Sequence, residues 1–106
     1  MKAGAPVSTQ QLSTLVNQEQ AVVLDVRDGK DFKQGHIVDS VNIPFKDIGE
    51  RLSELKEKDT PVIVVCKMGQ TASAASKQIK AAGFSKVYKL TGGLSEWQAA
   101  NLPLVK

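Results

Sequence analysis

VIVVCKMGQT, residues 62–71, is the stretch that decides the fold of this chain. Its first four residues form an uninterrupted run of β-branched apolar side chains, which is typical of a strand buried on both faces of a parallel sheet. Residues 68–70 break that run, and the following segment 71–82, rich in Ala, Lys and Gln, predicts a helix that Gly83 ends. The stretch therefore predicts a strand, a short loop and a helix, with Cys66 at the point where the strand ends.

The rest of the chain alternates the same two patterns. Ser8 and Gln11 have the spacing of a capping box at a helix start, and Asp47 is predicted to cap a helix that runs to about Lys58. The remaining predicted elements are strands at 21–26, 41–43 and 86–90, a turn with a short helix at 28–34, and a final helix at 94–100. Strands that alternate with helices indicate an α/β fold, in which a mostly parallel sheet is flanked by helices on both faces.

The length and composition are those of one small folded domain. The chain has 106 residues, of which 42% are hydrophobic and 24% charged, so it has enough apolar material for one core. We assign residues 7–106 to a single domain and residues 1–6 to an N-terminal tail or the stump of a linker. No apolar run is long enough to span a bilayer and no secretory signal is visible, so we expect a cytoplasmic location and no membrane contact from this chain. A chain trimmed of an anchor or export signal would look the same.

The charges and the metal-binding residue types exclude several classes of function. The net charge is +3, and basic and acidic residues are interspersed without a basic stripe, so we expect no nucleic-acid partner and only mild attraction for small anions. One cysteine and one histidine exclude an internal disulfide and a Cys/His metal cluster, and we expect neither a metal nor a cofactor. No exposed apolar stripe is evident, which predicts a monomer.

Cys66 is the strongest candidate for a reactive residue. In doubly wound sheets, ligands sit at the carboxyl ends of the strands, where Cys66 is expected. The loop after it directs successive N–H groups into one concavity, and the helix start adds its positive end, with Thr71 as the predicted cap. Gly69 permits close approach of the backbone and Lys67 adds a cation, so the surroundings favour the reactive thiolate. The alternative is that Cys66 is a small buried apolar residue that ends a core strand.

Four further residues have two interpretations each. Asp25 interrupts an apolar strand, so its carboxylate requires a partner, either Arg27 or backbone amides. Arg27 is either a residue that binds an anion or a salt partner of Asp25 or Asp28, and the salt-partner role is at least equally favoured. His36 is either a base beside the thiolate or a structural histidine near a turn, and the structural role is favoured. Trp97 is either a platform for a ligand or a core aromatic on the last helix, and the core role is favoured.

Five segments in register resemble the rhodanese family, and they are LDVR (24–27), GHI (35–37), SVNIP (40–44), VVC with its loop (64–71), and GGL with Trp97 (92–97). The resemblance covers nearly the whole chain and implies a single rhodanese-like domain with a five-stranded, mostly parallel sheet. It also implies sulfurtransferase chemistry, in which Cys66 attacks a donor such as thiosulfate and passes the sulfur, as a persulfide, to a thiol or cyanide. On the family pattern, the charged sulfur is stabilised by the backbone amides of Lys67, Met68, Gly69, Gln70, Thr71 and Ala72. Asp25 and Arg27 are candidates for a supporting role.

The loop itself narrows the chemistry. Related phosphatases and arsenate reductases of this fold carry an arginine where this chain has Ala72, so phosphate chemistry is not expected. Only Lys67 is basic in the loop, and Met68 stands where thiosulfate-type loops often carry a second cation. The expected partners are a small anionic sulfur donor and a thiol or cyanide acceptor, or a sulfur-accepting protein. A sulfur-relay module that carries persulfide to a protein partner with little turnover is the second hypothesis. A structural or regulatory domain is the third, and the intact cysteine disfavours it.

Overall fold

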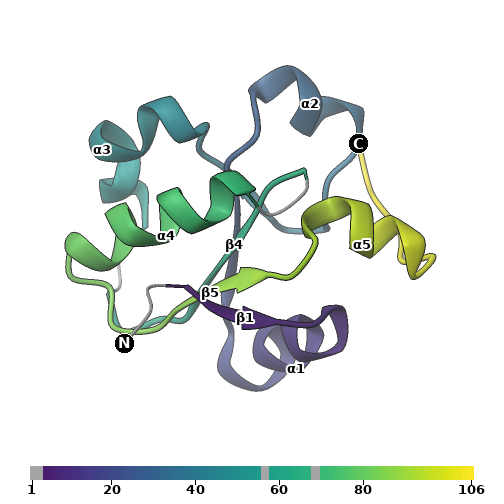
Figure 1. Cartoon of the computed structure of the whole chain (residues 1–106), viewed down its shortest axis with the longest axis horizontal. Coiled ribbons are helices and arrows are strands. Elements are labelled where there is room, and N and C mark those ends of the chain that lie inside the picture. The colour runs from purple at the N-terminus through teal and green to yellow at the C-terminus, as the bar shows by residue number, and fades with distance from the viewer. Residues whose placement is uncertain (1–3, 56–57, 68–69) are drawn as a thin grey trace.

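The centre of the fold is a five-stranded parallel sheet. The computed structural model describes residues 4–55, 58–67 and 70–106. The strands lie in the order β1-β5-β4-β2-β3, and they are β1 (Ala5–Val7), β2 (Val22–Asp25), β3 (Val41–Asn42), β4 (Val62–Val65) and β5 (Val87–Leu90). All four pairings between neighbouring strands are parallel. The predicted sheet is therefore confirmed, and the strand that decides the fold, β4, lies in its middle (Figure 1).

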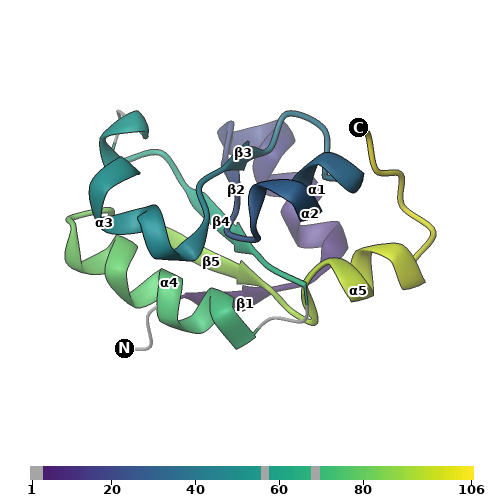
Figure 2. The same ribbon diagram turned by 90° about the horizontal axis from the view of Figure 1, so that it is seen from above.

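Helices cover both faces of the sheet, as predicted (Figure 2). One face carries α1 (Thr9–Glu19) and α5 (Gly93–Ala99), and the other carries α3 (Ile48–Arg51) and α4 (Gln70–Ala81). Two short 3-10 helices, η1 (Phe45–Asp47) and η2 (Leu52–Glu54), flank α3, and α2 (Gly29–Gln34) follows β2. No helix in the described parts of the chain is long and apolar enough to cross a bilayer.

The two faces of β4 build two separate cores. Val62 and Val64 join the cluster under α3 and α4, whereas Ile63 and Val65 join the cluster under α1 and α5. All four side chains are 1% exposed or less, as expected for a strand whose successive side chains point to opposite buried faces. Cys66 continues this alternation and belongs to the cluster on the α4 side.

The first helix begins as its sequence predicts. Gln11 donates its backbone N–H to Ser8 Oγ at 3.1 Å, and Ser8 donates its own N–H to Gln11 Oε1 at 2.8 Å. This reciprocal capping box satisfies two N–H groups that the start of a helix leaves unpaired. α1 therefore begins at Thr9 and buries Leu12, which is 2% exposed, against the sheet.

The helix predicted from Asp47 to Lys58 is wrong in length and in its cap. The segment is divided into η1, α3 and η2, and η2 ends at Glu54, while residues 56 and 57 lie outside the described residues. Asp47 makes no side-chain capping bond. Gly49 lies inside α3, where glycine weakens a helix by about 1 kcal/mol relative to alanine. The apolar side chains of this segment, which the sequence predicts to face inward, do so: Ile48 and Leu55 are buried, and Leu52 is partly buried against the same cluster.

The first strand was not predicted. β1 includes Ala5 and Pro6, which the sequence assigned to the N-terminal tail, and it pairs with β5. A three-residue segment that contains proline has no recognisable strand pattern. Pro6 is tolerated because β1 lies at the edge of the sheet, where one side of the strand needs no hydrogen-bond donors.

Candidate active site

Cys66 lies at the carboxyl end of β4, in the middle of the sheet. It is 4% exposed and packs in the core cluster on the α4 side. A pocket of about 360 Å³, called here the cysteine pocket, opens beside it, and its wall includes Arg27, Asp28, Lys46, Cys66, Lys67 and Thr71. Cys66 thus packs in the core and also lines a pocket, so its position is compatible both with a core residue and with a reactive residue.

Three cations stand on the wall of the cysteine pocket. Arg27 comes from the segment after β2, Lys46 from η1, and Lys67 from the loop after β4, and the acids Asp28 and Asp31 lie on the same wall. Lys46 is not among the candidates predicted from the sequence, because it lies 20 residues before Cys66 in the chain. The signal that points to it is its place just after β3, since parallel strands bring their carboxyl ends to one edge of the sheet.

The loop after Cys66 is described only in part. Lys67 is exposed, and Met68 and Gly69 lie outside the described residues. The expected close approach of the backbone at Gly69 therefore stays a prediction.

The first turn of α4 faces the cysteine pocket. α4 begins at Gln70, so Thr71 lies inside the helix, and the prediction that it caps the helix is wrong. A threonine hydroxyl can hydrogen-bond to the backbone both at the cap and inside a helix. A threonine near the start of a helix therefore does not show at which residue the helix begins. Thr71 lines the pocket, and Ala72 is fully buried. An anion beside Cys66 is therefore near the positive end of the α4 dipole.

The N-terminus of α5 holds the backbone of the cysteine loop. The N–H of Leu94 donates to the carbonyl oxygen of Cys66 at 2.8 Å, and the N–H of Ser95 donates to that of Lys67 at 3.0 Å. Ser95 Oγ donates to the same Lys67 oxygen at 3.1 Å. Gly93 has a φ of 61° and approaches so closely that a Cβ there would overlap the carbonyl of Cys66. The local sequence does not indicate this contact, because it joins segments that are far apart in the chain.

Asp25 and Arg27 form a buried ion pair beside the cysteine pocket. Asp25 is fully buried, and Arg27 Nε donates to its Oδ1 and Oδ2 at 3.0 and 3.1 Å, while Nη2 donates to Oδ2 at 2.7 Å. The backbone N–H of Arg27 donates to Oδ1 at 3.0 Å. Asp25 thus has both kinds of partner considered from the sequence, a guanidinium and a backbone amide.

Arg27 has a second anchor and keeps donors for a ligand. Its Nη2 also donates to the carbonyl oxygen of Gly35 at 2.7 Å. Nη1 has no hydrogen-bond partner among the residues that the structure describes, and the side chain is 14% exposed. The guanidinium is therefore a salt partner of Asp25 that still lines the cysteine pocket.

His36 and Trp97 have structural roles. His36 Nδ1 donates to the carbonyl oxygen of Phe32 at 2.8 Å, and its ring stacks on that of Phe32 with centroids 3.8 Å apart. Trp97 is 6% exposed and donates its Nε1–H to the carbonyl oxygen of Pro103 at 2.9 Å. Neither residue is on the described wall of the cysteine pocket, and both make the backbone contacts expected of a structural residue. Trp97 also lines a separate pocket of about 200 Å³.

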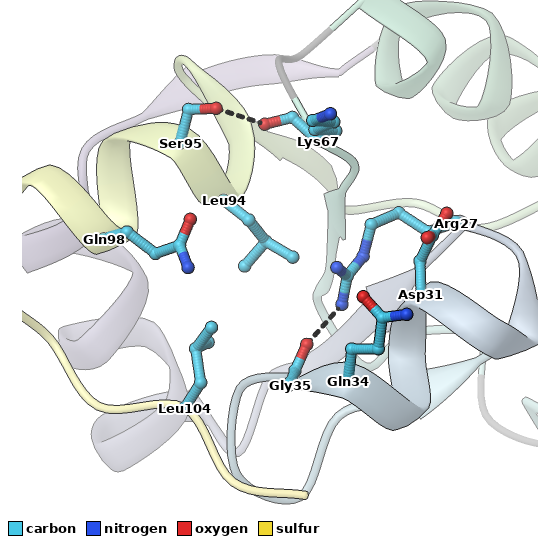
Figure 3. A pocket seen from close by; sticks show the side chains of 9 residues that line it. All are labelled: Arg27, Asp31, Gln34, Gly35, Lys67, Leu94, Ser95, Gln98 and Leu104. Atoms are coloured by element: carbon cyan, nitrogen blue, oxygen red, sulfur yellow. Dashed lines mark hydrogen bonds between the residues drawn. The ribbon is translucent and has the colours of Figure 1, made fainter.

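A second pocket of about 280 Å³ adjoins the first, and Figure 3 shows its side chains. Most of the lining residues come from α2 and the residue after it, from α5, and from the C-terminal segment, where Leu104 closes one side. Arg27, Asp31 and Lys67 line both pockets. Within the described ranges, no group of three or more His, Cys, Asp or Glu side chains could hold a metal ion.

Known sequences identify the relatives of this chain. The family model described as "Rhodanese-like domain" matches residues 8–100. The thiosulfate sulfurtransferase GlpE of Pseudoalteromonas translucida is 34% identical over 94 residues, which cover 89% of this chain and 89% of that protein. The "uncharacterized protein YibN" of Escherichia coli strain K12 is 42% identical over 94 residues, which cover 87% of this chain and 66% of YibN. The chain thus spans just under two thirds of the length of this relative.

Solved structures share the fold. A rhodanese-related protein from Thermoplasma volcanium superposes with a TM-score of 0.84 at 26% identity, covering 95% of this chain and 97% of that chain. The thiosulfate sulfurtransferase from Pseudomonas aeruginosa gives a TM-score of 0.84 at 28% identity, covering 96% of this chain and 20% of the longer one. One family accounts for the matching segments, for the parallel sheet and for the position of the cysteine. This chain belongs to the rhodanese-like domain family.

Proposed function

We propose that this chain is a sulfurtransferase that moves sulfane sulfur from a small anionic donor such as thiosulfate to a thiol or cyanide, through a persulfide on Cys66. The observation that carries the proposal is the position of Cys66 on the wall of a pocket that also presents Arg27, Lys46 and Lys67. A nucleophilic sulfur on a pocket wall with three cations and two acids suits an attacking thiolate and a doubly charged donor, because positive charge is in excess there. The similarity to GlpE supports the same chemistry, and a single thiol suits a reducing compartment such as the cytoplasm.

The first half-reaction would form the persulfide. The thiolate of Cys66 attacks the outer sulfur of thiosulfate, the bond between the two thiosulfate sulfurs breaks, and sulfite leaves with the electron pair. A thiolate and a dianion become a persulfide anion and the sulfite dianion, so the charge balances. The pocket cations hold the donor, while the first turn of α4 and the loop amides stabilise the charge on the sulfur.

The second half-reaction would restore the cysteine. Cyanide or a thiolate attacks the outer sulfur of the persulfide, and Cys66 leaves as a thiolate. α5 binds the carbonyl oxygens of Cys66 and Lys67 throughout, so the loop need not rearrange between the two steps. Such fixed dipoles contribute most to catalysis when they require no reorganisation.

Mass spectrometry of the protein after exposure to thiosulfate tests the proposal. We expect a gain of about 32 Da, one sulfur, that dithiothreitol removes and that Cys66→Ala lacks. The absence of this adduct with thiosulfate and with other sulfane donors would refute the proposal.

Steady-state turnover separates an enzyme from a sulfur relay. Rapid conversion of thiosulfate and cyanide, lost in Cys66→Ala, is expected of the enzyme. A stoichiometric persulfide with negligible turnover would favour the relay. The three pocket cations favour the enzyme, because they provide for a small anionic donor.

A further inference from the structure

We propose that the second pocket binds the sulfur acceptor, and that this acceptor is a small thiol that carries a carboxylate together with an amino or amide group, such as a short cysteine-containing peptide. The second pocket is hereafter called the acceptor pocket. The inference rests on the proposed function, because it assigns the molecule that takes the sulfur from Cys66.

The position of the acceptor pocket suits the tail of a substrate. Arg27, Asp31 and Lys67 line both pockets, whereas Cys66 lines only the cysteine pocket. A group in the acceptor pocket is therefore not itself the reacting sulfur. A molecule that fills this space can extend past the shared wall, so that its thiol enters the cysteine pocket.

The side chains around the acceptor pocket define the chemistry of that tail. Lys67 and the unused Nη1 of Arg27 provide positive charge for a carboxylate, and Asp31 provides negative charge for an ammonium group. In Figure 3, the side-chain amides of Gln34, on α2, and Gln98, on α5, approach the space from opposite sides. An amide both donates and accepts hydrogen bonds, as a peptide group requires.

These polar groups are available to a ligand. Gln34 and Gln98 are both exposed to solvent, and neither side chain is tied by a hydrogen bond to another residue in the described ranges. Cyanide is a two-atom anion and has no tail that could contact them. The buried side chain of Leu94 and that of Leu104 provide apolar surface for methylene groups. The pocket therefore discriminates among acceptors and has no function toward the simplest one.

The transfer itself is balanced. The acceptor thiol, RSH, gives up its proton, and its thiolate attacks the outer sulfur of the persulfide anion, Cys66–S–S⁻. The bond between the two persulfide sulfurs breaks and its electron pair stays on Cys66 as a thiolate. The proton that the thiol gave up is taken by the transferred sulfur, giving RS–SH. No oxidant or reductant is needed, because the sulfane sulfur moves from one thiol to another.

Single-turnover transfer tests the acceptor pocket. Cys66 is first loaded with thiosulfate, the excess is removed, and transfer is measured to glutathione, 3-mercaptopropionate, 2-mercaptoethanol and cyanide. For each acceptor the rate of the double variant Gln34→Leu/Gln98→Leu is divided by that of the unaltered protein, so intrinsic reactivities cancel. With glutathione we expect the transfer rate to fall about tenfold, because the variant lacks the hydrogen bonds to charged or peptide groups. We expect a smaller loss for 3-mercaptopropionate and none for 2-mercaptoethanol or cyanide.

Gln18→Leu is the matched control, because Gln18 is an exposed glutamine on α1 that lines neither pocket. Its rates should equal those of the unaltered protein. Equal losses for cyanide and glutathione in the double variant, no loss for glutathione, or transfer only to protein-borne thiols would overturn the inference.

A binding experiment separates failure of this inference from failure of the proposed function. S-methylglutathione cannot accept sulfur, and we expect it to shift the side-chain amide NMR signals of Gln34 and Gln98 in a saturable way. Persulfide formation on Cys66 without these shifts would overturn the acceptor pocket and leave the sulfurtransferase intact. Shifts in a protein that forms no persulfide would overturn the proposed function and, with it, the acceptor role.

Discussion

Arg27 and Asp25 meet at the end of β2 through four hydrogen bonds, three from the guanidinium and one from the backbone N–H of Arg27. The carboxylate is fully buried, so this pairing is what allows a charge at the end of a core strand. The same guanidinium bonds the carbonyl oxygen of Gly35, which ties the end of β2 to the segment after α2. One arginine thereby shapes both pockets.

Replacing Arg27 with leucine is expected to lower the free energy of unfolding by about 3–5 kcal/mol, because a buried carboxylate loses its cation. Urea denaturation measures the change. The double variant Asp25→Asn/Arg27→Leu buries no unpaired charge and should recover part of the loss. A single variant that loses less than about 1 kcal/mol would show that the pair is not needed to hold the buried charge.

Gly93→Ala is expected to damage both stability and turnover. The added Cβ would overlap the carbonyl of Cys66 and lie 2.8 Å from the carbonyl carbon of Lys67, at a φ of 61° that itself costs roughly 1–2 kcal/mol for a residue with a Cβ. The thermal midpoint should fall, and thiosulfate turnover should fall further than the loss of folded protein explains.

Gly49→Ala is the control for that substitution. It lies in α3 with no atom within 4 Å of the added Cβ, and alanine favours a helix by about 0.5–1 kcal/mol over glycine. Stability should be unchanged or raised, with normal turnover. Equal behaviour of the two alanine variants would contradict the role of Gly93 in holding the loop.

Lys46→Gln is expected to weaken the use of an anionic donor. Because Lys46 is exposed at the cysteine pocket, kcat/KM for thiosulfate should fall about two- to fivefold, and the difference should shrink at high salt. Lys77→Gln removes the same charge from an exposed position on α4 that does not line the pocket, and should have no such effect. Equal losses in the two variants would assign the effect to net charge rather than to position.

The surface pair of Arg51 and Glu54 gives a prediction on pH. Arg51 Nε donates to Glu54 Oε2 at 2.7 Å, and this bond lowers the pKa of the Glu54 carboxyl. In Arg51→Gln the pKa of Glu54 should rise toward its ordinary value, as measured by NMR titration of the side-chain carboxyl. The lowered pKa means that the pair stabilises the fold above the ordinary glutamate pKa and loses this effect as the pH falls through the lowered value. The effect should be small, because the two side chains are 38% and 46% exposed.

The elements that the sequence predicted well are those with local signals. The β-branched run before Cys66 identifies β4 without reference to any other segment, and Ser8 with Gln11 identifies the start of α1. β1 has no such signal, since its strand character comes from pairing with β5 and Pro6 obscures the pattern. The helix after Asp47 is shorter than its apolar pattern predicts, because Gly49 weakens it and the 3-10 helices η1 and η2 lie on either side of α3.

The same distinction applies to the site. The place of Cys66 at the end of β4 and the Asp25–Arg27 pair could be predicted, because each depends on residues close together in the chain. Lys46 and Gly93 were not assigned to the site, because their contacts depend on the order in which the strands lie in the sheet. No local pattern encodes that β3 ends beside β2, or that the chain leaving β5 returns over the end of β4.

The peptide unit that joins Cys66 to Lys67 is trans, so its C=O and N–H point in opposite directions. α5 binds the C=O, and the N–H is thereby turned away from α5. A helix on one side of the sheet thus fixes the direction of an N–H group that it does not contact. Substitutions along α5 can for this reason retune the reactivity of the sulfur while every residue of the cysteine pocket stays the same.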